Sequence, residues 1–477
     1  MIFNSIDFLI FLPIVFILYW QLKNNINPQN LFIVVVSYIF YGWWDYRFLF
    51  LISFTSLCSY YSGIMIDYYQ SDKSKKRLIA ICNILINIGI LAVFKYYNFF
   101  IQSLSYLLSQ FGIHLDFITI NIILPVGISF YTFQALSYTI DVYRGDIKAS
   151  HNIISFFAYI SFFPQLVAGP IERSTNLLPQ FSSIRTFKYE TAIDGLRQML
   201  WGFFKKIVVA DNCAAGVNHV FAEIDSLDSI SLFYGALMFS MQIYGDFSGY
   251  SDIAIGTSKI FGIKLMRNFN YPYFSRDIAE FWRKWHISLT TWFRDYLYIP
   301  MGGSRYGKLK SIKNTLIIFL TSGLWHGANW TFLLWGAYHA LLFIPLLITN
   351  KNRKHLAGIA EHSILPSFKE LIQMTTTFIL VLMGWIIFRA ENIGIAIKYY
   401  NRMFTNFELT LPEYGKTALI WIIIMLVAEW LQRDKQHTLQ IENSIQNKYV
   451  RHFIYYAIIS IIIIFQGETA QFIYFQF

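Results

Sequence analysis

The chain has 477 residues, of which 56% are hydrophobic, 19% aromatic and 14% charged, and its formal net charge at pH 7 is +10. Soluble domains carry about 25% charged residues, so these charges are too few to cover a surface that faces water. The composition therefore excludes a soluble globular protein and predicts an all-α, polytopic integral membrane protein.

Apolar segments of suitable length recur from the first residues onward. The opening sequence MIFNSIDFLIF lacks the basic segment and the cleavage site of a signal peptide, so it predicts a retained first helix. Because a helix needs about 20 residues to cross the hydrocarbon core, we expect about ten to thirteen embedded helices. Segments interrupted by Gly or Pro are expected to be re-entrant or buried within the protein. The candidate segments are Ile6–Trp20, Leu31–Trp44, Phe48–Ile66, Leu78–Phe94, Ile120–Ile140, Ile153–Val167, Gly195–Ala210, Ser229–Tyr244, Thr315–Leu320 with its continuation to Ile348, Leu371–Phe388, Thr417–Trp430 and Phe453–Phe465.

Basic residues gather in short loops, as they do in the cytoplasmic loops of membrane proteins. This distribution accounts for the positive net charge without nucleic-acid binding. The basic loops are Ser71–Arg77, Arg305–Lys313 and Lys351–Lys354. The last two bracket Asn314–Asn350, so if both are cytoplasmic, that stretch must enter the membrane and return to the same side. We expect a helical hairpin that bends near Gly323 or Gly327.

The segment RDIAEFWRKWHISLTTWFRDYLYIP predicts one amphipathic helix at about residues 277–299. Asp277 and Glu280 have the spacing of an N-terminal capping box, and Pro300 ends the helix. An apolar stripe at helical spacing suits a position at the cytoplasmic membrane interface. The stripe comprises Phe281, Trp285, Leu289, Trp292 and Tyr296.

Ionisable residues inside apolar segments are costly, which makes them candidates for function. His326, in the sequence SGLWHGANW, is the strongest candidate. On a continuous helix, Ser322, His326 and Asn329 share one side, and Gly323 and Gly327 allow a second helix to approach closely. The alternative is a histidine that is merely hydrogen-bonded between helices, and the spacing alone leaves both interpretations open.

Other polar positions carry weaker signals. His286, on the predicted interfacial helix, is open to a catalytic or a packing role. Asp246 lies in QIYGDFSGYSD, a Gly-rich break that predicts a re-entrant turn lining a cavity, and whether it binds a ligand or caps helix ends is open. No serine-hydrolase, phosphate-loop or dinucleotide motif and no metal site is evident. Acid–base chemistry would therefore fall to His326 or His286.

Several motifs taken together resemble the membrane-bound O-acyltransferase (MBOAT) family, in particular its bacterial alginate O-acetyltransferase branch. The resemblance covers essentially the whole chain, and several motifs in one order are specific where any single one is weak. The motifs are LPVGISFYTFQALSYTIDVYRG (Leu124–Gly145), FFPQLVAGPIER (Phe162–Arg173), QIYGDFSGYSD (Gln242–Asp252), FWRKWHISLTTWFRDYLYIPMGG (Phe281–Gly303) and LWHGANWTFLLWGAYHA (Leu324–Ala340). The resemblance implies a single membrane domain over residues 1–477, built as a helical bundle with a central tunnel.

The resemblance also implies an enzyme that moves acetyl groups from cytoplasmic acetyl-CoA across the membrane for O-acetylation of an extracytoplasmic polysaccharide, either an alginate-like exopolysaccharide or peptidoglycan. The family's catalytic histidine matches His326, which would act as a base or carry the acetyl group transiently. The second hallmark position matches His286, which would orient the thioester or polarise its carbonyl. Acetyl-CoA would be a donor substrate, with no cofactor bound permanently. The protein would lie in the bacterial inner membrane, in contact with lipid, with a separate extracytoplasmic acetyltransferase as its partner.

Five further side chains are candidates for binding the donor or the acceptor. Arg283 and Arg294 would meet CoA phosphates, although anchoring to anionic lipid explains them equally well. Ser322 and Asn329 would fix the tautomer of the catalytic histidine. Asp246 is the candidate from the Gly-rich motif.

Two other functions stay open at this point. A related branch of the family transfers D-alanine to teichoic acid from a carrier protein. A transporter or flippase would also carry a histidine within the membrane, but transporters are expected to show internal repeats with paired broken helices, and the sequence shows no convincing repeat.

Overall fold

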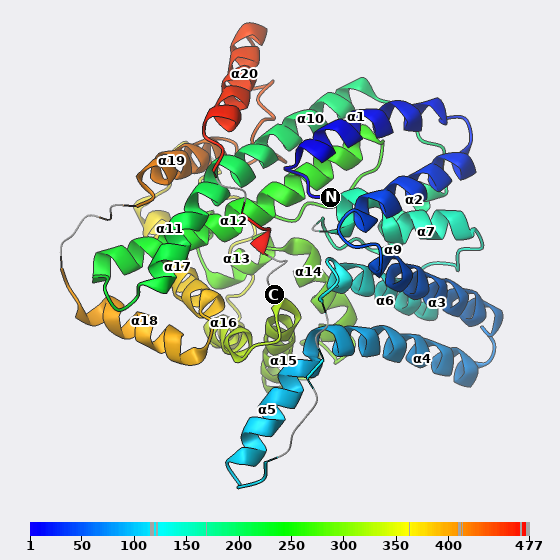
Figure 1. Cartoon of the computed structure of the whole chain (residues 1–477), viewed down its shortest axis with the longest axis horizontal. Helices are drawn as coiled ribbons and strands as arrows, with labels where there is room; N and C mark the ends of the chain where they lie inside the picture. The colour runs from blue at the N-terminus through cyan, green and yellow to red at the C-terminus, as the bar shows by residue number, and fades with distance from the viewer. Residues whose placement is uncertain are drawn as a thin grey trace. The chain divides into compact units, whose positions relative to one another are not determined.

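The computed structural model describes residues 1–114, 119–120, 123–167, 169–361, 363–408, 412, 414–467 and 470–473. Within these ranges the chain forms helices joined by turns and loops, with no β-strand (Figure 1). This confirms the predicted all-α membrane protein. The chain divides into two compact units, the first comprising Met1–Ala192 with Ser258–Leu265, and the second Ile193–Thr257 with Met266–Phe477.

The first unit contains the N-terminal helices. They are α1 (Ile6–Gln21), α2 (Ile26–Gly42), α3 (Phe48–Tyr68), α4 (Lys73–Leu91), the π-helical turn η1 (Ala92–Tyr96), α5 (Tyr97–Ser109), α6 (Ile128–Arg144), α7 (Ile153–Ser161), α8 (Phe163–Leu166) and α9 (Ser174–Phe181). α6 packs against both α3 and α4. The Thr139 hydroxyl of α6 donates to Asn83 Oδ1 of α4 at 2.8 Å. Gly63 of α3 lies directly against the Tyr138 ring, where a Cβ would clash, so a small residue is needed at this crossing.

The second unit holds most of α10 and α12 and all later helices. Its elements are α10 (Tyr189–Phe203), η2 (Phe204–Ala210), α11 (Asp211–Ala222), α12 (Ser229–Ile260), η3 (Pro272–Phe274), α13 (Ile278–Lys284), α14 (Ile287–Phe293), η4 (Arg294–Tyr298), α15 (Lys308–His326), α16 (Trp330–Ile348), α17 (Phe368–Arg389), α18 (Ile393–Thr405), α19 (Lys416–Leu431) and α20 (Lys448–Ile464). One buried apolar cluster joins α11, α12, α17 and α18. Its members include Val220, Leu232, Leu382, Tyr399 and Met403.

Four of the described helices are long and apolar enough to cross a membrane. They are Phe48–Tyr68, Lys73–Ser109, Trp330–Ile348 and Phe368–Arg389, and Ile6–Gln21 is apolar but shorter. Lys73–Ser109 is a continuous helix of 37 residues that contains the predicted segment Leu78–Phe94. The other predicted segments are helical over most of their described residues but are shorter or more polar, so the number of ten to thirteen embedded helices stays a prediction.

α15 and α16 form the predicted hairpin and lie side by side. Gly323 faces the carbonyl oxygen of Phe332, and Gly336 faces that of Phe319, so the register is antiparallel. A Cβ at either glycine would clash with the opposite backbone. The bend falls at Gly327, which confirms the prediction and shows that these glycines serve close helix packing.

We predict that the basic end of this hairpin faces the cytoplasm. Lys310 is exposed in the first turn of α15. In a background without the native exposed Cys82, Lys310→Cys is expected to react with a membrane-impermeant thiol reagent only after the cells are permeabilised. Lys354→Cys is the matched control, since the hairpin returns the chain to the same end. Ready labelling of Lys310→Cys in intact cells would refute this orientation.

The segment predicted as one interfacial helix is instead broken at Trp285 and His286. α13 ends at Lys284 and α14 begins at Ile287, with His286 in the left-handed region at φ 44°. The connection between α12 and α13 stabilises this break by a backbone hydrogen bond, in which the Ile287 N–H donates to the Asn268 carbonyl oxygen at 2.9 Å. The apolar stripe is also largely buried within the protein, with Phe281, Trp285 and Leu289 each 3% exposed or less. The expectation of a continuous helix is therefore wrong.

The Gly-rich motif around Asp246 is likewise not a break, because it lies inside the 32-residue helix α12. Gly249 faces the carbonyl oxygen of Gly202, and Gly245 faces that of Lys205. The glycines let α12 lie against the backbone of α10 and η2, and this packing offsets their low helix propensity. The predicted re-entrant turn is therefore wrong.

Candidate active site

His326 is the last residue of α15 and is 3% exposed. Its imidazole lies edge-on to Trp335 of α16 and Phe388 of α17, with ring centroids 5.1 Å and 5.3 Å away. The indole of Trp325 adjoins it at 4.9 Å. Helices α15, α16 and α17 thus build an aromatic enclosure that holds the imidazole in place and excludes bulk water.

Ser322 and Asn329 are placed differently from one another. Ser322 lies four residues before His326 on α15, so it shares a helix face with it as predicted, and it is buried. Asn329 caps α16: its Oδ1 accepts from the Thr331 N–H at 3.0 Å, and its Nδ2 donates to the Glu391 carbonyl oxygen at 2.8 Å. Because α15 ends at His326, the expectation that Asn329 shares a helix face with it is wrong.

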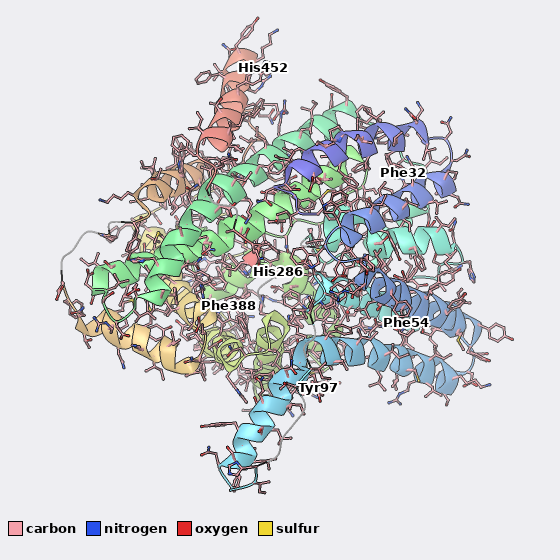
Figure 2. All side chains as sticks on the ribbon, viewed as in Figure 1. Phe32, Phe54, Tyr97, His286, Phe388 and His452 are labelled. Atoms are coloured by element: carbon pink, nitrogen blue, oxygen red, sulfur yellow. The ribbon has the colours of Figure 1, made fainter. Side chains whose placement is uncertain are left out.

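His286 is 1% exposed at the break between α13 and α14 and is labelled in Figure 2. Its ring stands perpendicular to Phe247 at a centroid distance of 4.6 Å. Burial lowers the pKa of His286 to about 3, so the imidazole is neutral at physiological pH. A left-handed backbone is uncommon for a residue other than glycine, and such conformations cluster at active sites.

The two histidines lie in the same unit and share one aromatic neighbour. The Trp325 ring is 5.6 Å from the His286 ring and 4.9 Å from the His326 ring, centroid to centroid. The fold thus brings two histidines from separate motifs into contact with one indole. This arrangement suits a site in which both imidazoles contribute to one reaction.

The two predicted donor-binding arginines have different surroundings. Arg283 donates to the carbonyl oxygens of Asn352 at 2.6 Å and His355 at 2.8 Å, which ties the loop after α16 to α13. Arg294 donates through Nε to Asp295 Oδ1 at 2.7 Å, and its side chain is 59% exposed. Arg283 therefore holds a loop, and contact of either arginine with a CoA phosphate stays a prediction.

Asp246 belongs to a buried ionic cluster. Its Oδ1 lies 2.8 Å from Lys206 Nζ, and its Oδ2 accepts from the Ile473 N–H at 2.7 Å. Lys206 also pairs with Asp211 at 2.7 Å. These contacts join α12, η2, α11 and the C-terminal segment, so in this structure Asp246 has a packing role, and its part in substrate binding stays a prediction.

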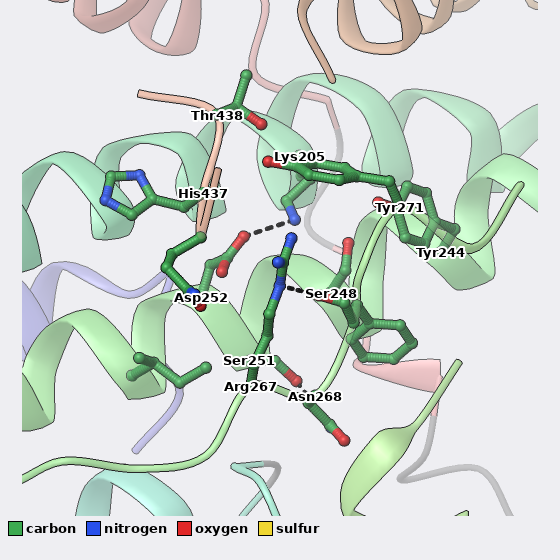
Figure 3. A pocket seen from close by; sticks show the side chains of 13 residues that line it. Lys205, Tyr244, Ser248, Ser251, Asp252, Arg267, Asn268, Tyr271, His437 and Thr438 are labelled. Carbon is green, nitrogen blue, oxygen red and sulfur yellow. Dashed lines mark hydrogen bonds and ion pairs between the residues drawn. The ribbon is translucent and has the colours of Figure 1, made fainter. Parts of the chain in front are cut away.

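A narrow polar pocket adjoins the His286 segment (Figure 3). The motif Gln242–Asp252, which was predicted to line a cavity, supplies four of its lining residues, although the motif is helical. Its cavity volume is about 10 Å³, room for roughly one water molecule. Lys205 Nζ pairs with Asp252 Oδ2 across it at 2.6 Å. The residues that line it include Ser248, Ser251, Arg267, Asn268 and Tyr271. Asn268 is shared between this pocket and His286, and its only sequence signal was its polarity in a short helix connection.

Comparisons with known proteins agree on one family. The sequence profile described as "MBOAT, membrane-bound O-acyltransferase family" matches residues 36–357, a range that contains both histidines. The chain is 40% identical over 420 residues to "Probable alginate O-acetylase AlgI" of Pseudomonas aeruginosa, covering 88% of this chain and 78% of the relative. It is 31% identical over 533 positions to "Peptidoglycan O-acetyltransferase" of Helicobacter pylori, covering 100% and 98%. It is 31% identical over 287 residues to "Teichoic acid D-alanyltransferase" of Bacillus subtilis, covering 57% and 70%.

Proposed function

Because the chain belongs to the membrane-bound O-acyltransferase family and is therefore a membrane O-acyltransferase, we propose that it moves acetyl groups from cytoplasmic acetyl-CoA across the bacterial inner membrane for O-acetylation of a polysaccharide. The observation that carries the proposal is the pair of buried histidines around Trp325. Acetyl transfer is favoured over D-alanyl transfer, since similarity to the O-acetylating relatives extends over 88% and 100% of the chain and similarity to the D-alanyltransferase over 57%.

In the proposed reaction His326 acts as the general base. Its imidazole takes the proton from the acceptor hydroxyl, and the hydroxyl oxygen attacks the thioester carbonyl carbon. The carbon–sulfur bond then breaks, and the departing thiolate takes the proton from the imidazolium, which leaves an acetyl ester and free CoA thiol. The aromatic enclosure of His326 supports this role, because a site without bulk water disfavours hydrolysis of the thioester.

The proposal also includes the depth of the reaction site in the membrane and a partner protein. Along α15, His326 lies 16 residues beyond Lys310, which is about 24 Å at the rise of an α-helix. If the basic end is cytoplasmic, the imidazole sits deep in the membrane, where a donor from one side can meet an acceptor from the other. The resemblance adds a separate extracytoplasmic acetyltransferase that receives the acetyl group or helps to pass it to the polymer.

The donor is tested with purified protein in lipid nanodiscs. We expect release of CoA thiol from acetyl-CoA when a hydroxyl acceptor is present, and little turnover of the D-alanyl thioester of a carrier protein. His326→Gln is the matched control and should release little thiol. Turnover of the D-alanyl thioester alone would overturn the proposed donor, and acetyl-enzyme trapped in a single turnover would make the histidine a carrier instead of a base.

Proteoliposomes separate the roles of this chain and its partner. With radiolabelled acetyl-CoA on one side and polysaccharide on the other, we expect the polymer to be labelled only when an extracytoplasmic acetyltransferase is added. Labelling of the polymer by this chain alone would show that no partner is required.

A further inference from the structure

Asn268 lies in the connection before α13, is 0% exposed, and directs its side-chain oxygen at the His286 turn. This Oδ1 lies 3.1 Å from His286 Nδ1 and accepts from the Ser288 hydroxyl at 2.9 Å and the Ser288 backbone N–H at 3.3 Å. On its other side, Asn268 Nδ2 donates to the Ser251 hydroxyl oxygen of α12 at 3.1 Å. The two polar atoms of one side-chain amide therefore hydrogen-bond to α12 on one side and to a predicted active-site histidine on the other.

The network determines which nitrogen of His286 carries the hydrogen. A backbone N–H can only donate, so the Asn268 atom that faces the Ser288 N–H must be the carbonyl oxygen. That oxygen can only accept, and the hydrogen bond with His286 then requires hydrogen on Nδ1. In a neutral imidazole the second nitrogen, Nε2, holds the lone pair.

From this geometry we propose that Asn268 is a positioning residue that holds His286 in the Nδ1-protonated tautomer, so that Nε2 accepts a hydrogen bond from a substrate N–H or O–H during acyl transfer. The inference rests on the proposed function and narrows one of its roles. A neutral histidine in this tautomer has no hydrogen to offer the thioester carbonyl, so His286 does not polarise that carbonyl. Its Nε2 instead orients the substrate N–H or O–H group from which it accepts a hydrogen bond.

The backbone and the packing support the same assignment. The Asn268 carbonyl oxygen accepts from the Ile287 N–H at 2.9 Å, so Asn268 holds both the left-handed turn and the ring that the turn presents. Phe247 and Trp325 contact the ring at centroid distances of 4.6 Å and 5.6 Å. A flipped ring would replace Nδ1 by a carbon atom and lose the hydrogen bond to Asn268.

Asn268→Asp is the sharpest test, because it preserves shape and adds a charge. A carboxylate beside Nδ1 is expected to raise the pKa of His286 by roughly 1 to 3 units from its lowered value of about 3. Below the raised pKa both ring nitrogens carry hydrogen, and His286 can no longer accept. We therefore expect the transfer rate of the variant, divided by that of the wild type, to fall as the pH is lowered from about 8 to about 4. The ratio cancels ionisations common to both proteins.

Other titratable groups lie on the elements around the network and are part of this comparison. Lys205, Asp252, Arg267 and His437 line the pocket with Asn268. The others are His326 on α15, Asp246 on α12, Lys206 on η2, and Arg283 and Lys284 on α13. All of them are unchanged between wild type and variant. A ratio that rises on acidification would mean that His286 donates a hydrogen, and a ratio independent of pH would mean that Asn268 does not control its protonation. Either result overturns the proposal.

Two further variants keep the inference testable if the charged variant is unstable. Asn268→Leu removes the acceptor, and we expect kcat to fall by roughly 10-fold or more while the KM for acetyl-CoA changes little. Thr291→Ala removes a hydroxyl of α14 that donates to the Ile287 carbonyl oxygen and makes no hydrogen bond to Asn268 or His286. It is the matched control and is expected to retain most of the activity. Thermal melting in nanodiscs identifies any variant whose loss comes from unfolding. An Asn268→Leu protein that is folded and has wild-type kcat would contradict the proposal, whereas a wild-type protein inactive with acetyl-CoA would refute the proposed function itself.

Discussion

His326→Gln is expected to lower acetyl transfer by at least roughly 10²-fold, the low end for general acid–base catalysis. Glutamine has a similar volume and forms hydrogen bonds, but it cannot take a proton from the acceptor hydroxyl. The side chain lies in an enclosure of Trp325, Trp335 and Phe388. The variant should therefore insert into the membrane, melt near the wild-type temperature and still bind acetyl-CoA. Transfer rate, melting temperature and donor affinity are measured on the same nanodisc preparation.

His339→Gln is the matched control for this experiment. His339 of α16 is also fully buried among aromatic rings, with Trp282 and Trp335 each 5.0 Å away between centroids. The same substitution there tests the general effect of losing a buried imidazole, and most of the activity should remain. A folded His326→Gln protein that acetylates at a near-normal rate would remove His326 from the mechanism and leave His286 as the leading candidate.

His286→Ala is expected to lose roughly 10²-fold in acetyl transfer while the protein stays folded. The loss follows from removing a positioned hydrogen-bonding group that acts in the transition state. Because burial lowers the pKa of His286 to about 3, the wild-type residue stays neutral above that pH. Its contribution should therefore be constant between about pH 5 and pH 8, and the fold loss in the variant should be the same throughout that range. The rate is measured across these pH values for both proteins.

The left-handed backbone at His286 requires a second variant. Alanine is strained at φ 44°, whereas glycine adopts this conformation without a steric penalty. His286→Gly thus removes the ring and relieves the strain together. Equal losses in both variants would assign the effect to the imidazole. Recovery of activity in His286→Gly would assign it to backbone strain, and wild-type activity in His286→Ala would leave the residue with a packing role only.

Composition and motifs were enough to assign the class of protein and its family. The scarcity of charge required a membrane environment, and apolar runs such as Phe48–Ile66 became helices because only internal hydrogen bonds satisfy the backbone in lipid. The hairpin of α15 and α16 was also predicted correctly, since basic loops flank it and glycines lie where the two helices touch. His326 and His286 were found through their motifs, as buried histidines are conspicuous in an apolar chain.

Helices that contain many polar or glycine residues could not be predicted from the apolar pattern. α18 was missed because it is amphipathic and short, and its apolar residues, among them Tyr399 and Met403, are buried only by contact with α11, α12 and α17. The reverse error occurred at Gly245 and Gly249, where local propensity favours a break and close packing on η2 and α10 preserves the helix. In both cases the deciding contacts include partners from other helices, which the local sequence does not show.

The arrangement around the histidines depends on contacts between separate segments of the chain. A continuous helical pattern runs through His286, yet the chain turns there because Asn268, in the connection before α13, bonds to its ring and to the backbone of Ile287. The sequence made Arg283 a candidate for binding a CoA phosphate. In the fold, its guanidinium instead donates to carbonyl oxygens of the loop after α16. Helical periodicity predicts which side chains share a face of one segment. Hydrogen bonds between segments set the tautomer and the orientation of a catalytic group, and they depend on how the segments pack in the folded protein.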